Sequence, residues 1–140
     1  MKKILVLMMV TAVVLAGSLA AAQTAQPKVG DKLFDFTLPV PAERADRNYL
    51  GISGWGKTFK VADIKANLVL IEILSMYCPF CQKEAPIVNQ LYEAIEKDPA
   101  AKGKIKIIGI GAGNSTYETE IFRKRYNVPF PVFPDPDYDI

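Results

Sequence analysis

The pattern of apolar and polar positions is strongest in the middle of the 140-residue chain. Residues 67–74 form an apolar run of strand length, rich in β-branched side chains, as expected for a central strand with both faces covered. A helical pattern follows over residues 79–97, with Pro79 suited to the first turn and Pro86 expected to introduce a kink. Its apolar positions recur at spacings of three and four: Ala85, Val88, Leu91, Tyr92 and Ile95.

A second strand and a second helix are predicted further along the chain. Residues 105–110 are predicted to form a buried strand, and three glycines are expected to open it into a turn: Gly109, Gly111 and Gly113. Ser115 and Glu118 have the spacing of a capping box, which predicts a helix extending to about Tyr126. In that helix Tyr117, Ile121 and Phe122 are expected to face inward, and Arg123, Lys124 and Arg125 outward.

The flanking segments give weaker signals. Residues 33–38 alternate like an early edge strand, which Pro39 and Pro41 end. Residues 42–56 indicate a loop that packs three side chains against the body: Tyr49, Ile52 and Trp55. Residues 58–64 suit a short strand or turn. The order strand, helix, strand, helix predicts an α/β domain built on a βαβ unit with a right-handed crossover.

The N-terminus has the layout of a secretory signal peptide. A basic start of three residues precedes an almost wholly apolar stretch, residues 4–19, and small residues follow at Ala20 to Ala22. We therefore predict a cleaved signal over residues 1–22, with an uncleaved membrane anchor as the alternative. Residues 23–28 form a polar linker, and residues 29–140 form the domain. The protein is thus expected to be exported, in the periplasm or otherwise outside the cytoplasm.

Charge excludes one class of partner. The chain has 17 basic and 15 acidic residues, and removal of Lys2 and Lys3 with the signal leaves fifteen of each. Without a basic stripe, nucleic acid is not an expected partner.

The only two cysteines, Cys78 and Cys81, lie between the predicted strand and helix. Cys78 stands at the helix N-terminus, where unpaired N–H groups favour a thiolate, and Cys81 lies one turn further on, within reach of a mixed disulfide on Cys78. The pair is therefore predicted to be redox-active. The alternative is a disulfide with a purely structural role, but a bridge between residues three apart closes a very small loop and would constrain the unfolded chain little. No histidine is present, so zinc lacks ligands and haem attachment lacks its motif.

Two glutamates are candidates for proton transfer near the thiols. Glu72 interrupts the apolar strand six residues before Cys78, and a buried acid there would have a raised pKa suited to moving the proton of the second thiol. The alternative is that Glu72 reaches solvent at a sheet edge. Glu84 lies one helical turn after Cys81, facing either the thiols or the solvent.

Several of these motifs together resemble the thioredoxin-like superfamily, and within it the exported thiol–disulfide oxidoreductases of the TlpA/ResA type. They are G-x-x-x-x-D-F-T-L at residues 30–38, the strand with Glu72, Y-C-P-F-C at residues 77–81, K-E-A-P at residues 83–86, I-K-I-I-G-I at residues 105–110 and P-F-P-V-F-P-D at residues 129–135.

The resemblance implies a nucleophile, Cys78, a resolving thiol, Cys81, the superfamily's buried acid, Glu72, and an active-site glutamate, Glu84. It implies no cofactor. The partners would be client proteins with cysteines or disulfides and an upstream thiol donor or acceptor. The resemblance favours reduction of clients over oxidation, although the Pro-Phe pair between the cysteines supplies no charge that fixes the direction.

The chain also departs from this family. The family's cis-proline loop, last hairpin and last helix have no counterpart before Ile140. We therefore expect an incomplete thioredoxin-like domain, with a central sheet edge unpaired and apolar surface exposed.

Two other functions remain open at this point. A peroxiredoxin-like peroxidase is suggested by Ser75-x-x-Cys78, although Ile71 stands where that motif has proline. A non-enzymatic module that binds clients or Cu(I) is the other, with the cysteine pair as an underligated copper site.

Overall fold

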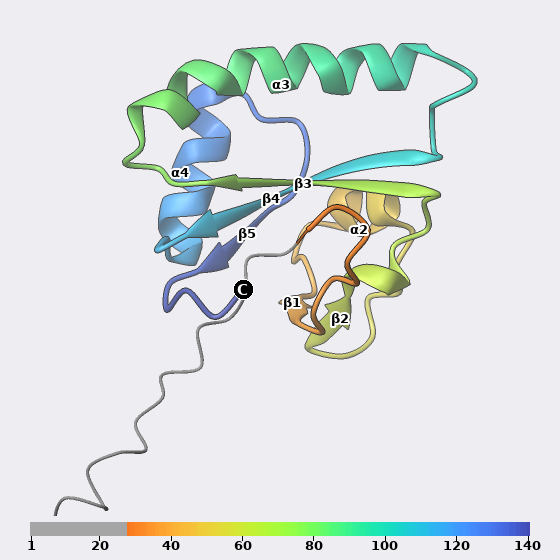
Figure 1. Ribbon diagram of the computed structural model, residues 1–140, viewed down its shortest axis with the longest axis horizontal. Helices are drawn as coiled ribbons and strands as arrows, with labels where there is room; N and C mark the ends of the chain where they lie inside the picture. The colour runs from red at the N-terminus through yellow and green to blue at the C-terminus, as the bar shows by residue number, and fades with distance from the viewer. Residues whose placement is uncertain (1–27) are drawn as a thin grey trace, which may run out of the picture. The chain divides into compact units, whose positions relative to one another are not determined.

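The computed structural model describes residues 28–140, and its helices and strands all lie within Asp35–Ile140 (Figure 1). The predicted signal, residues 1–22, and nearly all of the linker fall outside the described residues. Among the described helices, none has the length and apolar character needed to cross a membrane. Residues 28–34 contain a turn in which the backbone N–H of Asp31 donates to the carbonyl of Lys28 at 3.0 Å.

The described elements, in chain order, are β1 (Thr37–Pro39), α2 (Arg44–Leu50), β2 (Thr58–Lys60), the 3-10 turn η1 (Val61–Asp63), β3 (Leu68–Leu74), α3 (Pro79–Lys97), β4 (Ile105–Ala112), α4 (Thr116–Tyr126) and β5 (Val132–Asp135). The predicted strands and helices of the central part, including the bounds of α3, are thus confirmed.

A three-stranded parallel sheet in the order β3-β4-β5 forms the centre of the domain. In its register Leu68 lies opposite Ile105 and Glu72 opposite Gly109. The predicted β3-α3-β4 unit is therefore confirmed. A separate two-stranded antiparallel sheet joins β1 to β2, with Leu38 opposite Phe59.

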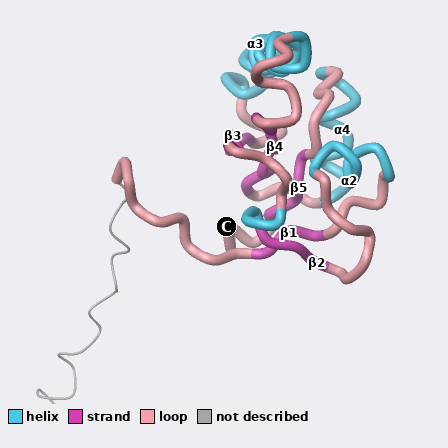
Figure 2. The backbone as a smooth tube through the Cα atoms, turned by 90° about the vertical axis from the view of Figure 1, so that its right-hand side faces the viewer, coloured by secondary structure: helices cyan, strands magenta, loops and turns pink. Residues whose placement is uncertain are grey.

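The two faces of the parallel sheet are covered by different elements, because alternate strand residues point to opposite faces. On one face Leu74 and Ile107 pack in a core with residues of α3 and α4 such as Ala85 and Phe122. On the other, Ile108 and Phe133 pack with β1, α2 and β2 through Leu38, Leu50 and Phe59. Figures 1 and 2 both show α3 on one side of the sheet and the β1–β2 pair on the other.

The prediction that residues 67–74 form a central strand covered on both faces is wrong for the described residues. There β3 pairs only with β4, so β4 is the central strand and β3 lies at the edge. As a result Leu68 and Ile73 are each more than half exposed. This unpaired, apolar edge agrees with the exposed sheet edge expected from the sequence.

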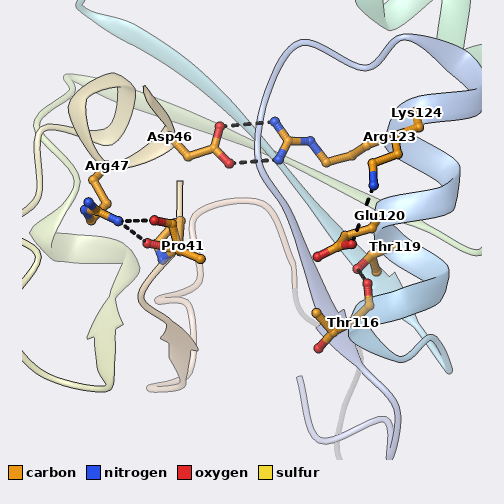
Figure 3. A network of polar contacts seen from close by, with 9 residues as sticks. Pro41, Asp46, Arg47, Thr116, Thr119, Glu120, Arg123 and Lys124 are labelled. Carbon is orange, nitrogen blue, oxygen red and sulfur yellow. Dashed lines mark hydrogen bonds and ion pairs between the residues drawn. The ribbon is translucent and has the colours of Figure 1, made fainter. Parts of the chain in front are cut away.

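The loop predicted over residues 42–56 is also wrong, because residues 44–50 form the helix α2, which ends at Gly51 in a left-handed conformation (φ 66°). Figure 3 shows a polar contact that ties this helix to α4: both guanidinium ends of Arg123 donate to the carboxylate of Asp46, at 2.8 and 3.1 Å. Arg123, predicted to face outward, thus joins α4 to α2 across 77 residues of sequence. A periodicity analysis of α2 alone contains no sign of this partner.

Three smaller expectations are also wrong. The early strand is limited to Thr37–Pro39, and Leu33 and Phe34 before it are exposed. Trp55, predicted to pack against the body, is 89 % exposed. Tyr117, predicted to face inward on α4, is exposed as well.

Two of the three glycines expected to open the strand into a turn instead continue it. Gly109 and Gly111 lie within β4, where their lack of a side chain makes room for neighbours. A Cβ on Gly111 would lie 2.5 Å from Thr119 Cγ2 and 3.1 Å from Asn114 Cβ. The turn begins only at Gly113, which has a positive φ of 66°.

Candidate active site

Cys78 and Cys81 stand at the N-terminus of α3, as the sequence predicts. Cys78 is the N-cap residue, with extended backbone angles (φ −82°, ψ 115°), and Pro79 occupies the first helical position, where no N–H is required. The Cys78 Sγ accepts a hydrogen bond from the backbone N–H of Cys81 at 3.5 Å. Both thiols are free and partly exposed, so the structure describes the reduced pair.

The two thiols differ in acidity because their surroundings differ. The hydrogen bond from the Cys81 backbone, followed by that from the Cys81 side chain, lowers the pKa of Cys78. Burial raises the pKa of Cys81, and the negative charge of Glu72 raises it further. The pKa values of the two thiols are thus shifted in opposite directions, and a lowered pKa favours the thiolate, which is the reactive form of a cysteine.

Glu72 is half-buried on β3, the strand that leads to the thiols. It shares the α3 face of β3 with Leu70 and Leu74, because strand residues two apart point to the same side. Burial raises the pKa of Glu72, with a smaller contribution from the charge of Glu84. The charge of Glu72 in turn contributes to the raised pKa of Cys81. The sequence analysis left two alternatives for Glu72: burial near the thiols, or contact with solvent at a sheet edge. The structure has features of both, because β3 is an edge strand and the Glu72 carboxyl is nonetheless partly buried.

Glu84 lies on the exposed surface of α3. Its charge nonetheless reaches the site, because it raises the pKa of both Glu72 and Cys78. Glu84 is thus near the thiols and in contact with solvent.

The residues that hold the loop before Cys78 were missed by the sequence analysis. The side-chain oxygen of Asn114 accepts from the backbone N–H of Met76 at 2.7 Å, and the amide of Gln82 donates to the Met76 carbonyl at 2.8 Å. The hydroxyl of Tyr77 donates to Glu118. A usable signal did exist, because Asn114 follows a buried parallel strand next to β3, and the carboxyl ends of parallel strands share one edge of the sheet.

Two features of the surroundings bear on which ligands or partners the site could bind: exposed apolar side chains and the arrangement of possible metal ligands. Two apolar side chains adjacent in sequence to the thiols are well exposed, Tyr77 and Phe80. Within residues 28–140, no cluster of three or more cysteine, aspartate or glutamate side chains is arranged to hold a metal ion.

Comparison with known proteins places this geometry in a family. Residues 29–140 match the model of the AhpC/TSA family. Among curated relatives, the thiol-disulfide oxidoreductase ResA of Bacillus cereus (strain ZK / E33L) is 31 % identical over 77 residues, which are 55 % of this chain and 42 % of that protein. ResA of Bacillus subtilis (strain 168) is 27 % identical over 85 residues, or 61 % and 45 %. The chain thus spans less than half the length of these relatives.

Solved structures agree on the fold. A proposed protein disulfide isomerase from Bacteroides thetaiotaomicron has a TM-score of 0.57 at 22 % identity, covering 80 % of this chain and 60 % of its own. A proposed thiol:disulfide interchange protein DsbE from Chlorobium tepidum has a TM-score of 0.56 at 22 % identity, covering 79 % and 64 %. The chain therefore belongs to the AhpC/TSA family, and its α/β fold is that of the thioredoxin-like superfamily.

Proposed function

We propose that this protein is a thiol–disulfide oxidoreductase that reduces disulfides of client proteins through Cys78 and Cys81. The observation that carries the proposal is the asymmetric pair at the start of α3, in which Cys78 has a lowered pKa and Cys81 a raised one. The curated relatives named above, which are thiol-disulfide oxidoreductases, support the same chemistry.

The reaction begins with the Cys78 thiolate, which attacks one sulfur of a client disulfide. The client S–S bond breaks, a mixed disulfide forms between Cys78 and the client, and the other client sulfur leaves as a thiolate. Cys81 then loses its proton and attacks the Cys78 sulfur. The client is released with two thiols, and the protein retains a Cys78–Cys81 disulfide that an upstream thiol donor must reduce.

Glu72 is the proposed proton acceptor for Cys81. Its partial burial raises the pKa of the Glu72 carboxyl, so that it accepts a proton more readily than an ordinary carboxylate and can return it later, as a general base requires. Glu84 is proposed to tune this step, since its charge disfavours ionisation of Glu72 and of Cys78.

The place of the reaction follows from the N-terminal residues. The signal-like pattern of residues 1–22 supports an exported protein that acts outside the cytoplasm, either released after cleavage or anchored in the membrane. The exposed apolar side chains adjacent in sequence to the thiols, Tyr77 and Phe80, are proposed to contact clients.

The proposal is tested by trapping the intermediate. Cys81→Ser removes the resolving thiol, so mixing the reduced variant with a disulfide protein such as insulin should give a mixed disulfide that dithiothreitol releases. Cys78→Ser is the matched control, since it keeps one thiol in the same helix and should give little adduct.

Two results would contradict the proposal. One is an adduct that forms equally well through Cys81 in the Cys78→Ser variant, because the assigned roles would then be wrong. The other is consumption of hydrogen peroxide by the Cys81→Ser variant at the full rate, which would favour the peroxidase function over exchange with clients.

A further inference from the structure

Asn114 is a polar side chain in the described domain that is wholly buried (0 % exposed) and has no part in the chemistry above. It lies in the turn between β4 and α4, beside the loop that leads to Cys78. Its side-chain oxygen accepts from the Met76 N–H at 2.7 Å, and its side-chain amide donates to the Ser75 hydroxyl at 3.4 Å. A buried amide with both ends bonded to one loop fixes that loop in place.

Asn114 is itself held firmly by the fold. Its backbone N–H donates to the Gly111 carbonyl at 3.0 Å, and its carbonyl accepts from the Asp135 N–H at 3.2 Å. Gly111 leaves the space that Asn114 fills, since a Cβ on Gly111 would approach Asn114 Cβ to 3.1 Å. Asn114 is therefore held in place by the ends of β4 and β5, and its side-chain amide in turn fixes the loop before Cys78.

The carbonyl of Met76, the residue whose N–H bonds to Asn114, is bonded to a side chain of α3. The Gln82 amide donates to the Met76 carbonyl at 2.8 Å, so the N–H and the carbonyl of Met76 are both bonded to side chains. Two residues later the Cys78 N–H donates to the Ser75 carbonyl at 3.0 Å, closing the turn that brings Cys78 to the N-cap. The position of the thiol thus follows from the position of Met76.

We propose that Asn114, together with Gln82, is a positioning residue that holds Met76 so that the Cys78 sulfur stays at the N-cap of α3. The inference rests on the proposed function, because the thiolate at that place is what attacks the client. Without this support the Cys78 sulfur would lose part of the hydrogen bond from the Cys81 N–H, and the thiolate would be less favoured.

The test measures alkylation of Cys78 by iodoacetamide as a function of pH, in the full chain carrying Cys81→Ser so that one thiol reacts. Asn114→Ala should slow the reaction at pH 7 by about threefold or more, because less thiolate is present. The rates should converge near pH 10, where the thiol is ionised in either protein. Gln82→Ala, a change on α3, should shift the pH profile of the alkylation rate in the same direction. If Asn114→Ala does not fold, the profile of Gln82→Ala tests the proposal in its place.

The matched control is Asn89→Ala. Asn89 is a partly buried asparagine on α3 whose side-chain amide donates to two backbone carbonyls away from the thiol loop, those of Tyr126 and Asn127 at 2.9 and 3.3 Å. It should lower stability without moving the pH profile. The proposal is overturned by profiles of Asn114→Ala and Gln82→Ala that match this control, or by a rate that changes by one factor at every pH. Because alkylation needs no client, this readout is independent of whether the pair exchanges disulfides.

Discussion

The ion pair between Asp46 and Arg123 gives the sharpest stability prediction (Figure 3). The side chains of Asp46 and Arg123 are only 12 % and 25 % exposed, and each of the two terminal guanidinium nitrogens donates to a different carboxylate oxygen. Replacement of one partner leaves the other charge largely without water and without a counterion. We therefore predict that Asp46→Asn is strongly destabilising.

The magnitude follows from the burial. Removal of one partner of a fully buried pair costs about 3–5 kcal/mol. Because part of the Arg123 side chain can regain water, we expect about 2–3 kcal/mol for Asp46→Asn. In a domain of this size that corresponds to a fall in melting temperature of roughly 10–20 °C.

The assay is equilibrium unfolding in urea for Asp46→Asn, Arg123→Met and the double variant. The double variant should cost about 2 kcal/mol less than the sum of the single changes, since it leaves no unpaired charge. The pair of Lys97 and Glu93, joined at 2.9 Å on the surface of α3 with side chains 75 % and 61 % exposed, is the matched control. Glu93→Gln should cost no more than about 0.5 kcal/mol.

Additive effects in the double variant, or an Asp46→Asn cost as small as that of Glu93→Gln, would refute the reasoning. Either result would mean that α2 does not depend on α4 for its place. The pair would then be an incidental surface contact.

Two further predictions concern single residues. Burial raises the pKa of Glu72 above its value in the unfolded chain, so its favourable contribution is complete below the unfolded pKa and is lost as pH rises through the folded pKa. Thermal melts should therefore show Glu72→Gln gaining stability over the native protein at pH 8 and losing this advantage at low pH; a constant difference would contradict the burial. The same variant should slow release of the mixed disulfide about 100-fold or more. Phe130→Ala, at a fully buried position, should cost about 3–5 kcal/mol in urea unfolding. Phe80→Ala, on the exposed surface, should stay within about 0.5 kcal/mol; equal costs would show that the assigned core is wrong.

Features with a local physical cause were predictable from the sequence. The bounds of α3 follow from Pro79 at its first position and from its apolar period, and the start of α4 follows from the capping box of Ser115 and Glu118, whose two hydrogen bonds are present. The placement of Cys78 at a helix N-terminus needed no tertiary information, because strand, cysteine and helix are adjacent in the chain.

Features that depend on distant partners were not predictable. The helix α2 is joined to Arg123, which lies 77 residues from Asp46. The edge position of β3 depends on which strands pair, and an apolar run looks the same at an edge as at the centre. Asn114 gained its role only when the ends of β3 and β4 met, 38 residues apart in sequence.

The central claim is that Cys78 and Cys81 form a reducing, exchangeable pair, and its most direct test is the redox equilibrium with glutathione, followed by alkylation and mass measurement. The account predicts a pair that equilibrates at a potential below the glutathione range, near the thioredoxin value of about −270 mV. A potential near about −120 mV would reverse the proposed direction, making the protein an oxidant. A pair that never equilibrates with glutathione would contradict the proposed function altogether.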